Sequence, residues 1–496
     1  MKYNPKTSSL SSLVPIPPEL DRHINNLQLD SRLITVGDVF IACPASNQDA
    51  NYHGKNYIDK AIQAGAVAIL IDATEQQAIE FHHNIPCIPY PELNQQLGHI
   101  AAQFYANPSQ QLNCIAVTGT NGKTSVSHFI AQLLSQQLPK PCGLLGTLGY
   151  GVYGQLQTGQ HTTPDALRLQ ALLANLVSKD TSHLVMEVSS HALAQNRVQG
   201  MEFNTAIFTN LTRDHLDYHG TMENYAKAKQ QLFNWPNLSN AIINLDDEFG
   251  KILLAKLANK VQNLTYSLTN PQADLFATAT ACKQGYKLQI KTPWGTGQVL
   301  SPLLAKFNIA NLLAALGACL LENMNLEQIL TGIESLKPVT GRMEAIHRPA
   351  TPLIVIDYAH TPDALAQALQ ALRPHCQGEL YCVFGCGGDR DKGKRPLMGK
   401  IAAQYADKLL ITNDNPRHEK PNNIIADIVK GIDSAVNTIP DRATAIAKAM
   451  HLATPKDVVL IAGKGHETYQ QIGDNFINFS DREQVLANLS SVQATS

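Results

Sequence analysis

Residues 115–125 read Ile-Ala-Val-Thr-Gly-Thr-Asn-Gly-Lys-Thr-Ser, an apolar strand followed by a glycine-punctuated turn and a helix that begins near Lys123. Gly119 and Gly122 let backbone N–H groups approach an anion closely, and the helix N-terminus adds partial positive charge. Lys123 would neutralise β- and γ-phosphates, and the Thr124 hydroxyl would ligate Mg²⁺. Val117 stands at the first glycine position of the common G-x-x-x-x-G-K-S/T pattern, so the loop is a shortened form. We expect a phosphate-binding loop made of Gly119, Thr120, Asn121, Gly122, Lys123, Thr124 and Ser125.

The chain has 496 residues and a formal net charge of −2. Its length exceeds a single hydrophobic core and predicts roughly three domains. The mixed charges give no electrostatic case for binding nucleic acid or a membrane surface, so small-molecule chemistry is favoured. The nine cysteines are scattered, and the close pair Cys382 and Cys386 lacks a second pair that would complete a zinc site. Since no apolar run has the length of a signal peptide or a membrane span, we expect a cytoplasmic protein, and we expect it to act as a monomer.

Strand-like and helix-like segments alternate along most of the chain, which predicts an α/β fold with parallel sheets covered by helices. A small first domain covers residues 1–92. Residues 93–338 hold the phosphate loop, several buried strands and a more polar, strand-rich insert, and they predict a central P-loop parallel-sheet domain. After a turn at 337–341 the alternation restarts, which predicts a Rossmann-like third domain over 339–496. The expected strands are 67–71, 85–90, 115–117, 184–187, 206–209, 241–245, 353–357, 380–384, 408–412 and 458–462, with the insert at 274–300.

Polar side chains follow two of the expected strands of the central domain. Glu187 ends the strand 184–187, and a carboxylate at the carboxyl edge of a parallel sheet faces the nucleotide crevice and suits a hard cation. The strand 206–209 is followed by a loop that carries Asp214, His215 and further His, Asp and Arg side chains. A strand-end Glu is often only a solvated end or a helix cap, but the polar residues around it favour a site. Asp214 and His215 are well placed to orient a metal ion or a phosphate.

Six segments together resemble the Mur ligases, the ATP-dependent amide-forming enzymes of peptidoglycan precursor synthesis. The segments are residues 118–125, 186–191 and 210–220, Gly341-Arg-Met-Glu344, Asp357-Tyr-Ala-His360 and Gly463-Lys-Gly-His-Glu467. The likeness runs from about residue 28 to the C-terminus and implies the three-domain layout of that family. It also implies the family's reaction, in which the γ-phosphoryl group of ATP is transferred to a carboxylate and an amine then displaces phosphate from the acyl phosphate. The pattern is closest to the members that add meso-2,6-diaminopimelate to UDP-N-acetylmuramoyl-L-alanyl-D-glutamate.

Two details depart from the family pattern. The segment Leu304-Ala-Lys306-Phe-Asn308 lacks the glycine that usually precedes the basic residue. Thr340 stands where proline is common. Neither difference touches a reacting group.

The resemblance implies roles for charged residues at the reaction centre. Lys123 and Arg342, together with Mg²⁺, would offset the charge on the transferred phosphoryl group. Lys229 matches the lysine that these ligases carry as a carbamate, N6-carboxylysine, because a bare ammonium beside Mg²⁺ would repel it. The plain alternative is an unmodified surface lysine, and Lys227 would face elsewhere on the same helix. The implied catalytic residues are Lys123, Lys229, His215 and Arg342, and the implied metal ligands are Thr124, Glu187, His215 and Lys229.

The same resemblance implies substrate contacts in all three domains. Leu29 and Ser31 match the uridine-binding segment, so the first domain would bind the UDP-sugar. Thr163-Pro-Asp165 also has the pattern of a helix start, with proline at the first helical position. The implied contacts with the UDP-sugar and its peptide are Leu29, Ser31, His161, Thr162, Thr163, Ser189, Gln195 and Arg197. Besides the phosphate loop, the implied ATP contacts are Asn308, Asn311, Arg342, Asp357 and His360, the last two on closure of the third domain.

The segment Asn413-Asp-Asn-Pro-Arg417 bears on the amine substrate, because it resembles the D-N-P-R segment of the members that take meso-2,6-diaminopimelate. Arg417 can hold the distal carboxylate of that amino acid in a bidentate charged pair, which the ammonium of lysine cannot offer. Lysine-adding relatives lack this arginine. The implied diaminopimelate contacts are Arg390, Asp414, Asn415, Pro416, Arg417, Gly463 and Glu467.

Three alternatives stay open. A lysine-adding ligase is the alternative within the family. A folylpolyglutamate synthase shares the loop and the ligase chemistry, but it would lack both the uridine-type first domain and the segment 414–417. A nucleotide-dependent switch or a scaffold for cell-wall proteins would leave Glu187, His215 and Lys229 without a purpose. ADP release that requires both the nucleotide-sugar dipeptide and an amino acid would identify a ligase.

Overall fold

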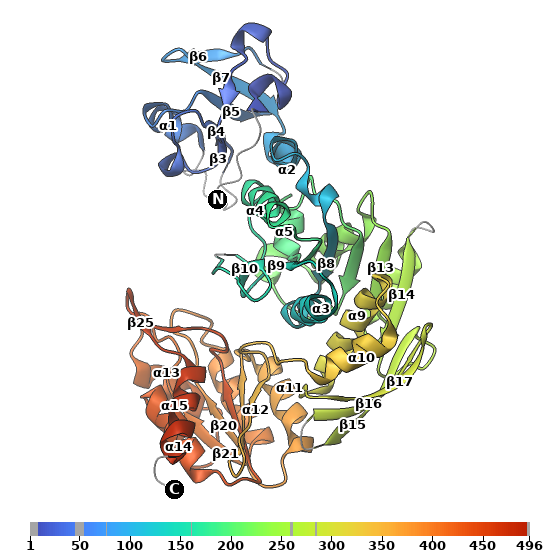
Figure 1. Cartoon of the computed structure of the whole chain (residues 1–496). Coiled ribbons are helices and arrows are strands. Elements are labelled where there is room, and N and C mark those ends of the chain that lie inside the picture. The colour runs from blue at the N-terminus through green and yellow to red at the C-terminus, as the bar shows by residue number, and fades with distance from the viewer. Residues whose placement is uncertain are drawn as a thin grey trace. The chain divides into compact units, whose positions relative to one another are not determined.

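A computed structural model describes residues 8–44, 54–75, 77–159, 161–257, 261–282 and 285–493 of the chain. The chain forms two compact units, Met1–Asp274 with Ala314–Met324 and Leu275–Leu313 with Asn325–Ser496. Both units contain parallel sheets with helices beside them, so the predicted α/β class is confirmed (Figure 1). No helix in the described part of the chain has the length and apolar character needed to cross a bilayer.

The N-terminal sheet of the first unit has the strand order β3-β4-β5-β7-β6, in which β6 is antiparallel to β7 and the other neighbours are parallel. The predicted strands 67–71 and 85–90 are confirmed as β5 and β7. Apolar residues of α2 and α4 belong to the same buried cluster as this sheet, so the two helices join it to the rest of the unit. The bounds are β1 (Ser8–Ser9), β2 (His23–Ile24), β3 (Leu27–Gln28), β4 (Val39–Ala42), α1 (Ile58–Gln63), β5 (Ala68–Ala73), β6 (Glu80–His82), β7 (Ile85–Pro91) and α2 (Leu93–Phe104).

The central sheet of the first unit has the order β10-β9-β11-β8-β12-β13-β14. Its neighbours from β9 to β14 are parallel, and β10 runs antiparallel beside β9. The bounds are β8 (Asn113–Thr118), α3 (Lys123–Gln137), β9 (Cys142–Gly146), β10 (Gly149–Val152), α4 (Ala166–Ser178), β11 (His183–Glu187), α5 (Ser190–Ala194), β12 (Thr205–Phe208), α6 (Leu216–His219), α7 (Met222–Gln230), β13 (Asn240–Asn244), α8 (Glu248–Lys256) and β14 (Gln262–Ser267).

The predicted strands of this sheet are confirmed as β8, β11, β12 and β13, but β9, β10 and β14 were not predicted. β9 contains Gly143 and Gly146, and β14 begins with two exposed polar residues, Gln262 and Asn263. Neither strand therefore shows the short, bounded apolar run that indicates a buried strand.

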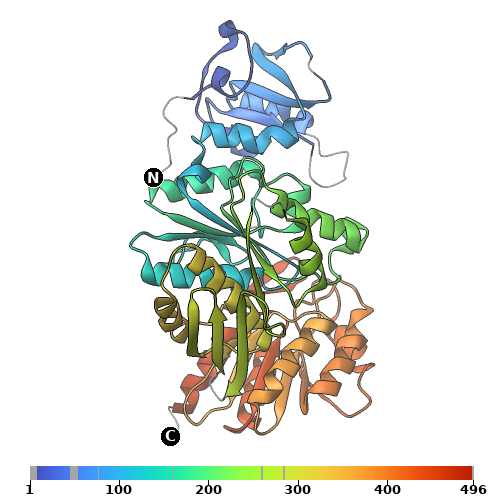
Figure 2. The same ribbon diagram turned by 90° about the vertical axis from the view of Figure 1, so that its right-hand side faces the viewer.

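The second unit begins with an antiparallel meander of β15, β16 and β17, which confirms the predicted strand-rich insert. Buried and exposed residues alternate along β16, and α10 packs against β17, so one face of the meander is covered (Figure 2). The bounds are β15 (Leu275–Cys282), β16 (Gly285–Thr292), β17 (Gly295–Ser301), α9 (Lys306–Leu321) and α10 (Leu326–Glu334).

The second unit continues with a sheet of order β18-β19-β23-β20-β21-β22, parallel except that β18 is antiparallel to β19. The predicted strands 353–357, 380–384, 408–412 and 458–462 are confirmed as β19, β20, β21 and β23. The bounds are β18 (Glu344–Ile346), β19 (Leu353–Asp357), α11 (Pro362–Leu372), β20 (Leu380–Phe384), α12 (Lys394–Tyr405), β21 (Lys408–Ile411), α13 (Pro421–Val429), β22 (Asn437–Thr438), α14 (Arg442–Leu452), β23 (Val458–Ala462), β24 (Tyr469–Ile472), β25 (Asn475–Asn478) and α15 (Asp481–Gln493).

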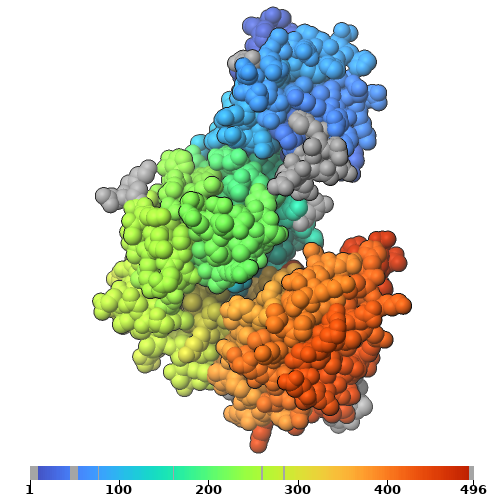
Figure 3. Space-filling view, turned by 180° about the vertical axis from the view of Figure 1, so that it is seen from behind, coloured from blue at the N-terminus to red at the C-terminus, as the bar shows by residue number. Residues whose placement is uncertain are grey.

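Helices cover both faces of this six-stranded sheet. Leu369 of α11, Met398 of α12 and Ile428 of α13 belong to the buried cluster on one face. Ile446 of α14 and Val485 of α15 belong to the cluster on the other face. In the space-filling view the residues beyond 340, coloured orange to red, gather into one body (Figure 3). With both faces covered, the carboxyl edge of the sheet is where loops can present polar groups to a ligand.

Candidate functional site

The phosphate loop lies where the sequence predicts it, between β8 and α3. Gly119 and Gly122 have φ angles of 152° and 86°, which side chains with a Cβ rarely adopt. A Cβ atom at Gly119 would lie 1.8 Å from Thr209 Oγ1, so the loop passes directly against the end of β12. Lys123 Nζ donates to the carbonyl oxygens of Gly119 and Thr120, each at 2.9 Å. The ammonium group therefore lies over the turn that would cradle a phosphate.

Two residues that follow β12 hold the tip of this loop, although neither is among the predicted site residues. Asn210 Oδ1 accepts from the backbone N–H of Asn121 at 2.9 Å, and Asn210 Nδ2 donates to the Asn121 carbonyl oxygen at 3.2 Å. Thr209 Oγ1 donates to the same carbonyl oxygen at 2.6 Å. Because β12 is the parallel neighbour of β8, the carboxyl ends of the two strands lie side by side, and residues after β12 can contact the loop after β8.

Glu187 ends β11 with its side chain buried. Glu187 Oε2 accepts from Thr124 Oγ1 at 3.1 Å and from Thr147 Oγ1 at 3.0 Å, and Oε1 accepts from the Thr147 N–H at 2.8 Å. These donors carry no charge, so the carboxylate is solvated by hydrogen bonds without being neutralised. Thr147, which directly follows β9, was not among the predicted site residues. The strand β9 before it was not predicted either, because its two glycines interrupt the apolar run that indicates a buried strand.

Lys229 lies on α7, and only 1 % of it is exposed. Its Nζ donates to the Gly119 carbonyl oxygen at 2.8 Å and lies 4.4 Å from the centre of the Tyr225 ring. Burial lowers the pKa of Lys229 well below its usual value, and the neighbouring charge of Lys123 lowers it further. Lys227 is exposed and pairs with Glu223 at 2.8 Å, so the prediction that the two lysines face different ways is confirmed.

Aromatic and imidazole rings lie side by side next to this lysine. The His215 ring is 4.8 Å from the His191 ring, and the Tyr218 ring is 4.3 Å from the His191 ring, measured between ring centres. Burial, with contributions from His215 and His219, lowers the pKa of His191 to about 4. His191 is therefore neutral near pH 7. The described residues contain no group of three or more His, Cys, Asp and Glu side chains arranged to hold a metal ion, so a cation near Glu187 would need other oxygen ligands as well.

Four of the residues matched to the UDP-sugar and its peptide come together beside Glu187. Thr163 Oγ1 donates to the Glu187 carbonyl oxygen at 2.8 Å, and the Ser189 N–H donates to Thr163 Oγ1 at 3.2 Å. Arg197 Nη1 donates to the Thr163 carbonyl oxygen at 3.1 Å, and Nη2 donates to Gln195 Oε1 at 2.5 Å. The strand end of β11 and the start of α4 are thus joined by hydrogen bonds.

The predicted helix start at Thr163-Pro-Asp165 is correct in place but wrong in register. α4 begins at Ala166, and Asp165 is its cap, accepting from the Arg168 N–H at 3.0 Å. Pro164 therefore precedes the cap and does not occupy the first helical position, because Thr163 is held by Glu187 and Ser189 outside the helix.

The other residues matched to the nucleotide-sugar lie on separate elements of the first unit. Thr162 Oγ1 is hydrogen-bonded to Thr147 Oγ1 at 3.1 Å, and the His161 carbonyl oxygen accepts from the Tyr150 hydroxyl. Leu29 and Ser31 follow β3 of the N-terminal sheet. Leu29 is 36 % exposed, whereas Ser31 is buried.

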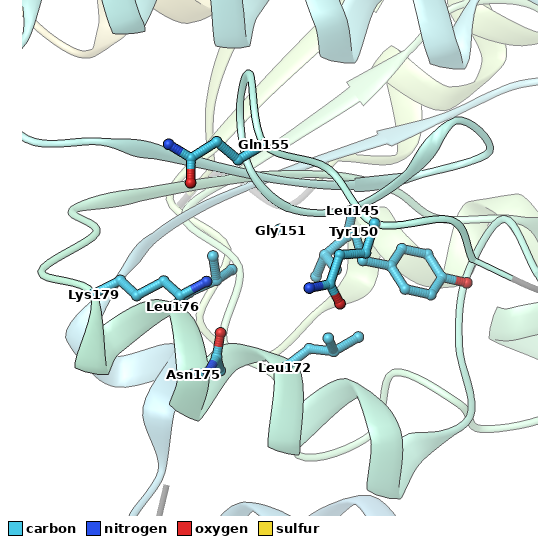
Figure 4. A pocket seen from close by; sticks show the side chains of 9 residues that line it. Leu145, Tyr150, Gly151, Gln155, Leu172, Asn175, Leu176 and Lys179 are labelled. Carbon is cyan, nitrogen blue, oxygen red and sulfur yellow. The ribbon is translucent and has the colours of Figure 1, made fainter. Parts of the chain in front are cut away.

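A small cavity of about 40 Å³ lies between α4 and the hairpin β9–β10 (Figure 4). It is lined by Leu145, Tyr150, Gly151, Gln155, Gln157, Leu172, Asn175, Leu176 and Lys179. None of these is a predicted site residue, and the cavity has room for no more than about three water molecules.

In the second unit, several of the segments that carry the resemblance meet at the carboxyl edge of the six-stranded sheet. Asp357 ends β19, and its carboxylate accepts from the Met343 N–H at 2.7 Å and the Ala359 N–H at 2.9 Å. Burial raises the pKa of Asp357. Gly341 has a φ of 67°, and a Cβ there would lie 2.1 Å from the backbone nitrogen of His466. The segments 341–344 and 463–467 are therefore in close contact.

Arg342 and His360 flank the same strand end. The Arg342 guanidinium carbon lies 4.5 Å from the centre of the Tyr358 ring. His360 Nδ1 is hydrogen-bonded to the Tyr358 carbonyl oxygen at 2.8 Å, and the His360 carbonyl oxygen accepts from Lys394 Nζ at 2.9 Å. Burial lowers the pKa of His360. The rings and guanidinium thus form a cationic and aromatic group at the end of β19.

The two asparagines matched to adenine lie near the start of α9. Asn311 Nδ2 donates to Asn308 Oδ1 at 3.3 Å, and Asn308 Nδ2 donates to the Leu304 carbonyl oxygen at 3.0 Å. Ala305 stands at the position where the family usually has glycine, and its φ is 73°. An alanine in this left-handed conformation costs about 1–2 kcal/mol. The alanine that replaces the usual glycine of the family is therefore held in a strained backbone conformation.

The segment 414–417 follows β21 and faces a second loop after β20. Arg417 Nη1 donates to the Gly388 carbonyl oxygen at 2.7 Å, and Arg417 Nε donates to Gln471 Oε1 at 3.2 Å. Arg417 is partly buried with a φ of 50°, while Arg390, at the end of the β20 loop, is exposed. The guanidinium of Arg417 is thus held between two elements.

A buried lysine, which is not among the predicted site residues, links Asn415 and Glu467. Lys464 Nζ donates to Asn415 Oδ1 at 3.1 Å and to Glu467 Oε2 at 2.9 Å, and Asn415 Nδ2 also donates to Glu467 Oε2 at 2.9 Å. A Cβ at Gly463 would lie 2.8 Å from Asp414 Oδ2. The structure therefore brings the segments 414–417 and 463–467 together as expected. Lys464 could have been predicted as a site residue, because it lies inside the motif 463–467 that carries the resemblance.

Comparisons with known proteins assign the family. Family models described as Mur ligase family catalytic domain, Mur ligase middle domain and Mur ligase glutamate ligase domain match residues 23–105, 117–319 and 341–465. The UDP-N-acetylmuramoyl-L-alanyl-D-glutamate–2,6-diaminopimelate ligase of Coxiella burnetii is 46 % identical over 468 residues, which cover 93 % of this chain and 94 % of the relative. The chain belongs to the Mur ligase family. The resemblance drawn from six segments is therefore confirmed.

Two further similarities agree with this assignment. The ligase of the same name from Pseudomonas aeruginosa is 48 % identical over 482 residues, which cover 96 % of this chain and 97 % of the relative. A solved structure of a UDP-N-acetylmuramoyl-L-alanyl-D-glutamate–2,6-diaminopimelate ligase is 36 % identical, covers 98 % of this chain and 100 % of its own, and superposes with a TM-score of 0.73. The three-domain α/β architecture of Mur ligases is therefore that of this chain.

Proposed function

We propose that this chain is the ATP-dependent ligase that joins meso-2,6-diaminopimelate to UDP-N-acetylmuramoyl-L-alanyl-D-glutamate in peptidoglycan precursor synthesis. One observation carries the proposal, namely that relatives named as this ligase are 46 % and 48 % identical over 93 % and 96 % of the chain. The protein works in the cytoplasm as a monomer, and its nine free thiols suit a reducing compartment. Its domains are 1–92 for the UDP-sugar, 93–338 for ATP and 339–496 for the amino acid.

The phosphate loop binds ATP through its backbone N–H groups and the N-terminus of α3. An oxygen of the substrate carboxylate forms a bond to the γ-phosphorus while the bond to the β–γ bridging oxygen breaks, which gives ADP and an acyl phosphate. The amine then attacks the acyl carbon, loses a proton and releases phosphate. Lys123 stabilises the charge that moves in the first step, since its ammonium already lies over the loop. Arg342, Asp357 and His360 reach the nucleotide when the third domain closes.

The residues around Glu187 fit a hard cation. Its buried carboxylate receives only neutral donors from Thr124 and Thr147, and carboxylate and hydroxyl oxygens are what Mg²⁺ prefers. When bound, Mg²⁺ would neutralise phosphate oxygens. His215 completes the proposed ligand set with Lys229, but an ammonium at Lys229 would oppose a cation.

Modification of Lys229 to a carbamate removes that conflict. Only a neutral amine has the lone pair to attack CO₂, and burial keeps the pKa of Lys229 well below its usual value. The neutral nitrogen bonds to the carbon of CO₂, one C–O π bond opens, and the nitrogen loses one proton to water, so a neutral buried amine becomes an anion. Lys123, whose charge opposes an ammonium at this position, would attract the carbamate instead.

The nucleotide-sugar dipeptide binds along the first unit. Thr163, Ser189, Gln195 and Arg197 are already joined in one hydrogen-bonded group next to Glu187. This group would place the acceptor carboxylate near the phosphate loop. Leu29 and Ser31, with His161 and Thr162, would hold the sugar and uridine end.

The amine substrate binds at the segments 414–417 and 463–467. Arg417 would receive the distal carboxylate of diaminopimelate, and Glu467 with Asn415 would face its ammonium group. Asp414, Pro416, Gly463 and the exposed Arg390 complete the proposed contacts. A lysine side chain lacks the distal carboxylate, so it would leave Arg417 without a partner.

An assay of ADP release with a panel of acceptors tests the function. We expect release only when the nucleotide-sugar dipeptide and meso-2,6-diaminopimelate are both present, and far less with L-lysine at the same concentration. A missing polar partner costs more than a missing methylene, so the preference should exceed about 100-fold in kcat/KM. Equal or better use of lysine would establish the lysine-adding alternative. Glutamate addition to a folate would establish the folylpolyglutamate synthase alternative, and ADP release without any acceptor would favour a nucleotide switch.

A further inference from the structure

The hairpin β24–β25 holds the loop that carries Arg417. The Gln471 N–H donates to Asn415 Oδ1 at 2.9 Å, and the Gln471 carbonyl oxygen accepts from the Arg417 N–H at 3.1 Å. The Gly473 N–H donates to the Arg417 carbonyl oxygen at 2.8 Å. Both backbone polar groups of Arg417 are therefore bonded to the hairpin, and its φ of 50° is imposed by these contacts.

The Gln471 side chain fixes the orientation of the Arg417 guanidinium. Gln471 Nε2 donates to the Gly473 carbonyl oxygen at 3.2 Å, so the amide oxygen is the group that faces Arg417. Arg417 Nε donates to that oxygen at 3.2 Å, and Arg417 Nη1 donates to the Gly388 carbonyl oxygen at 2.7 Å. Two bonds from different atoms of one planar group set the direction of its plane.

We propose that Gln471 is a positioning residue that sets the preference of the enzyme for an amine with a distal carboxylate. The proposal rests on the function proposed above. A guanidinium binds a carboxylate best through two parallel bonds, which requires that its plane be set before the substrate arrives. An amide suits this task because its oxygen accepts from Arg417 without neutralising the charge that the substrate carboxylate must meet.

The loop has a second anchor that does not involve Gln471. His418 Nδ1 is 2.8 Å from Asp389 Oδ2, and His418 Nε2 is 3.2 Å from Asp474 Oδ1. The neighbouring Glu419 accepts from Arg395 Nη2 at 2.7 Å and from the Asp389 N–H at 2.7 Å. Replacing the Gln471 side chain therefore leaves the loop after β20, the loop after β21 and the hairpin joined. It removes one of the two hydrogen bonds that orient the guanidinium.

The test compares Gln471→Ala and Gln471→Glu with Ile472→Ala, which changes an exposed residue of the same strand that is 44 % exposed. KM and kcat are measured for diaminopimelate, L-lysine and ATP, with a thermal melt of each variant. Losing a hydrogen bond to a charged group should raise KM for diaminopimelate about 10- to 100-fold in Gln471→Ala and leave KM for ATP unchanged. The ratio of kcat/KM for diaminopimelate to that for lysine should fall at least about tenfold. Gln471→Glu should lower this ratio at least as far, because its carboxylate competes with the substrate for Arg417.

Retention of the wild-type ratio by Gln471→Ala, or an equal loss with both amines, would overturn the proposal. If Gln471→Ala melts well below Ile472→Ala, the isosteric Gln471→Glu carries the same test. A wild-type enzyme that does not use diaminopimelate would refute the proposed function itself. A wild-type enzyme that prefers diaminopimelate, with variants that keep this preference, would refute only the role of Gln471.

Discussion

Replacing Lys229 by methionine should abolish ligation and at the same time stabilise the ligand-free protein. Burial of an ammonium costs several kcal/mol even after relaxation. The hydrogen bond to Gly119 at 2.8 Å and the Tyr225 ring at 4.4 Å offset only part of this cost, by about 1–3 kcal/mol together. Methionine fills a similar volume without a charge, so the free energy of unfolding should rise by about 1–3 kcal/mol. That gain corresponds to a rise of roughly 2–4 °C in Tm per kcal/mol for a unit of this size.

The pH dependence of this effect has a definite sign. The pKa of Lys229 is lowered in the folded protein from the usual 10.5, so the unfolded chain binds more protons between the two values. The stability of the wild type should therefore rise with pH through that window. The penalty is complete below the folded-state pKa and absent above 10.5. The advantage of Lys229→Met should accordingly be largest at neutral or lower pH and vanish as the pH approaches 10.5.

Thermal melts and ADP release, each with and without bicarbonate, measure both effects. Bicarbonate should raise the Tm of the wild type, because the carbamate is an anion that Lys123 attracts, whereas Lys123 repels the protonated amine. It should leave the Tm of Lys229→Met unchanged. Ligation should fall at least about 100-fold, as when one electrostatic element of a reaction centre is lost. Lys227→Met, on the exposed face of the same helix, is the matched control and should change neither quantity. A Lys229→Met protein that is less stable than the wild type at pH 7, or that keeps its turnover, would refute the reasoning.

Three further predictions concern other charged residues. Lys123→Ala should raise the activation free energy by roughly 3 kcal/mol or more, while the circular dichroism spectrum stays native. Near-normal turnover would show that the phosphate loop takes no part in the mechanism. Arg417→Ala should lose most activity with diaminopimelate while its affinity for ATP, measured by calorimetry, is unchanged; a parallel loss of ATP binding would contradict the assignment. Arg442→Met should lower the free energy of unfolding by about 3–5 kcal/mol in urea, because it leaves the fully buried Asp481 without the partner that lies 2.7 Å away, and an undiminished stability would show that this pair is unimportant.

Local chemistry made much of the site predictable. The glycines, lysine and threonine of the phosphate loop are adjacent in sequence, and the strand before them is a continuous apolar run, so Gly119 to Ser125 could be placed before any tertiary contact was known. Glu187 was recognisable because it ends a strand of the same kind. Lys229 depended on the family resemblance, since a lysine on a polar helix has no local feature that reveals its burial.

The sequence by itself determined the α/β class, the order of the motifs and the polar residues at the ends of the strands 184–187 and 206–209. Periodicity and turn chemistry are properties of neighbouring residues, so a local pattern records them. Tertiary structure alone brought Thr147 to Glu187, Asn210 to the phosphate loop, and Lys464 and Gln471 to the segment 414–417. These residues lie on strands, loops or hairpins whose spatial neighbours are not their sequence neighbours. Strand order decides which carboxyl ends meet at one edge of a sheet, and that order results from long-range packing of both sheet faces, which no local pattern records.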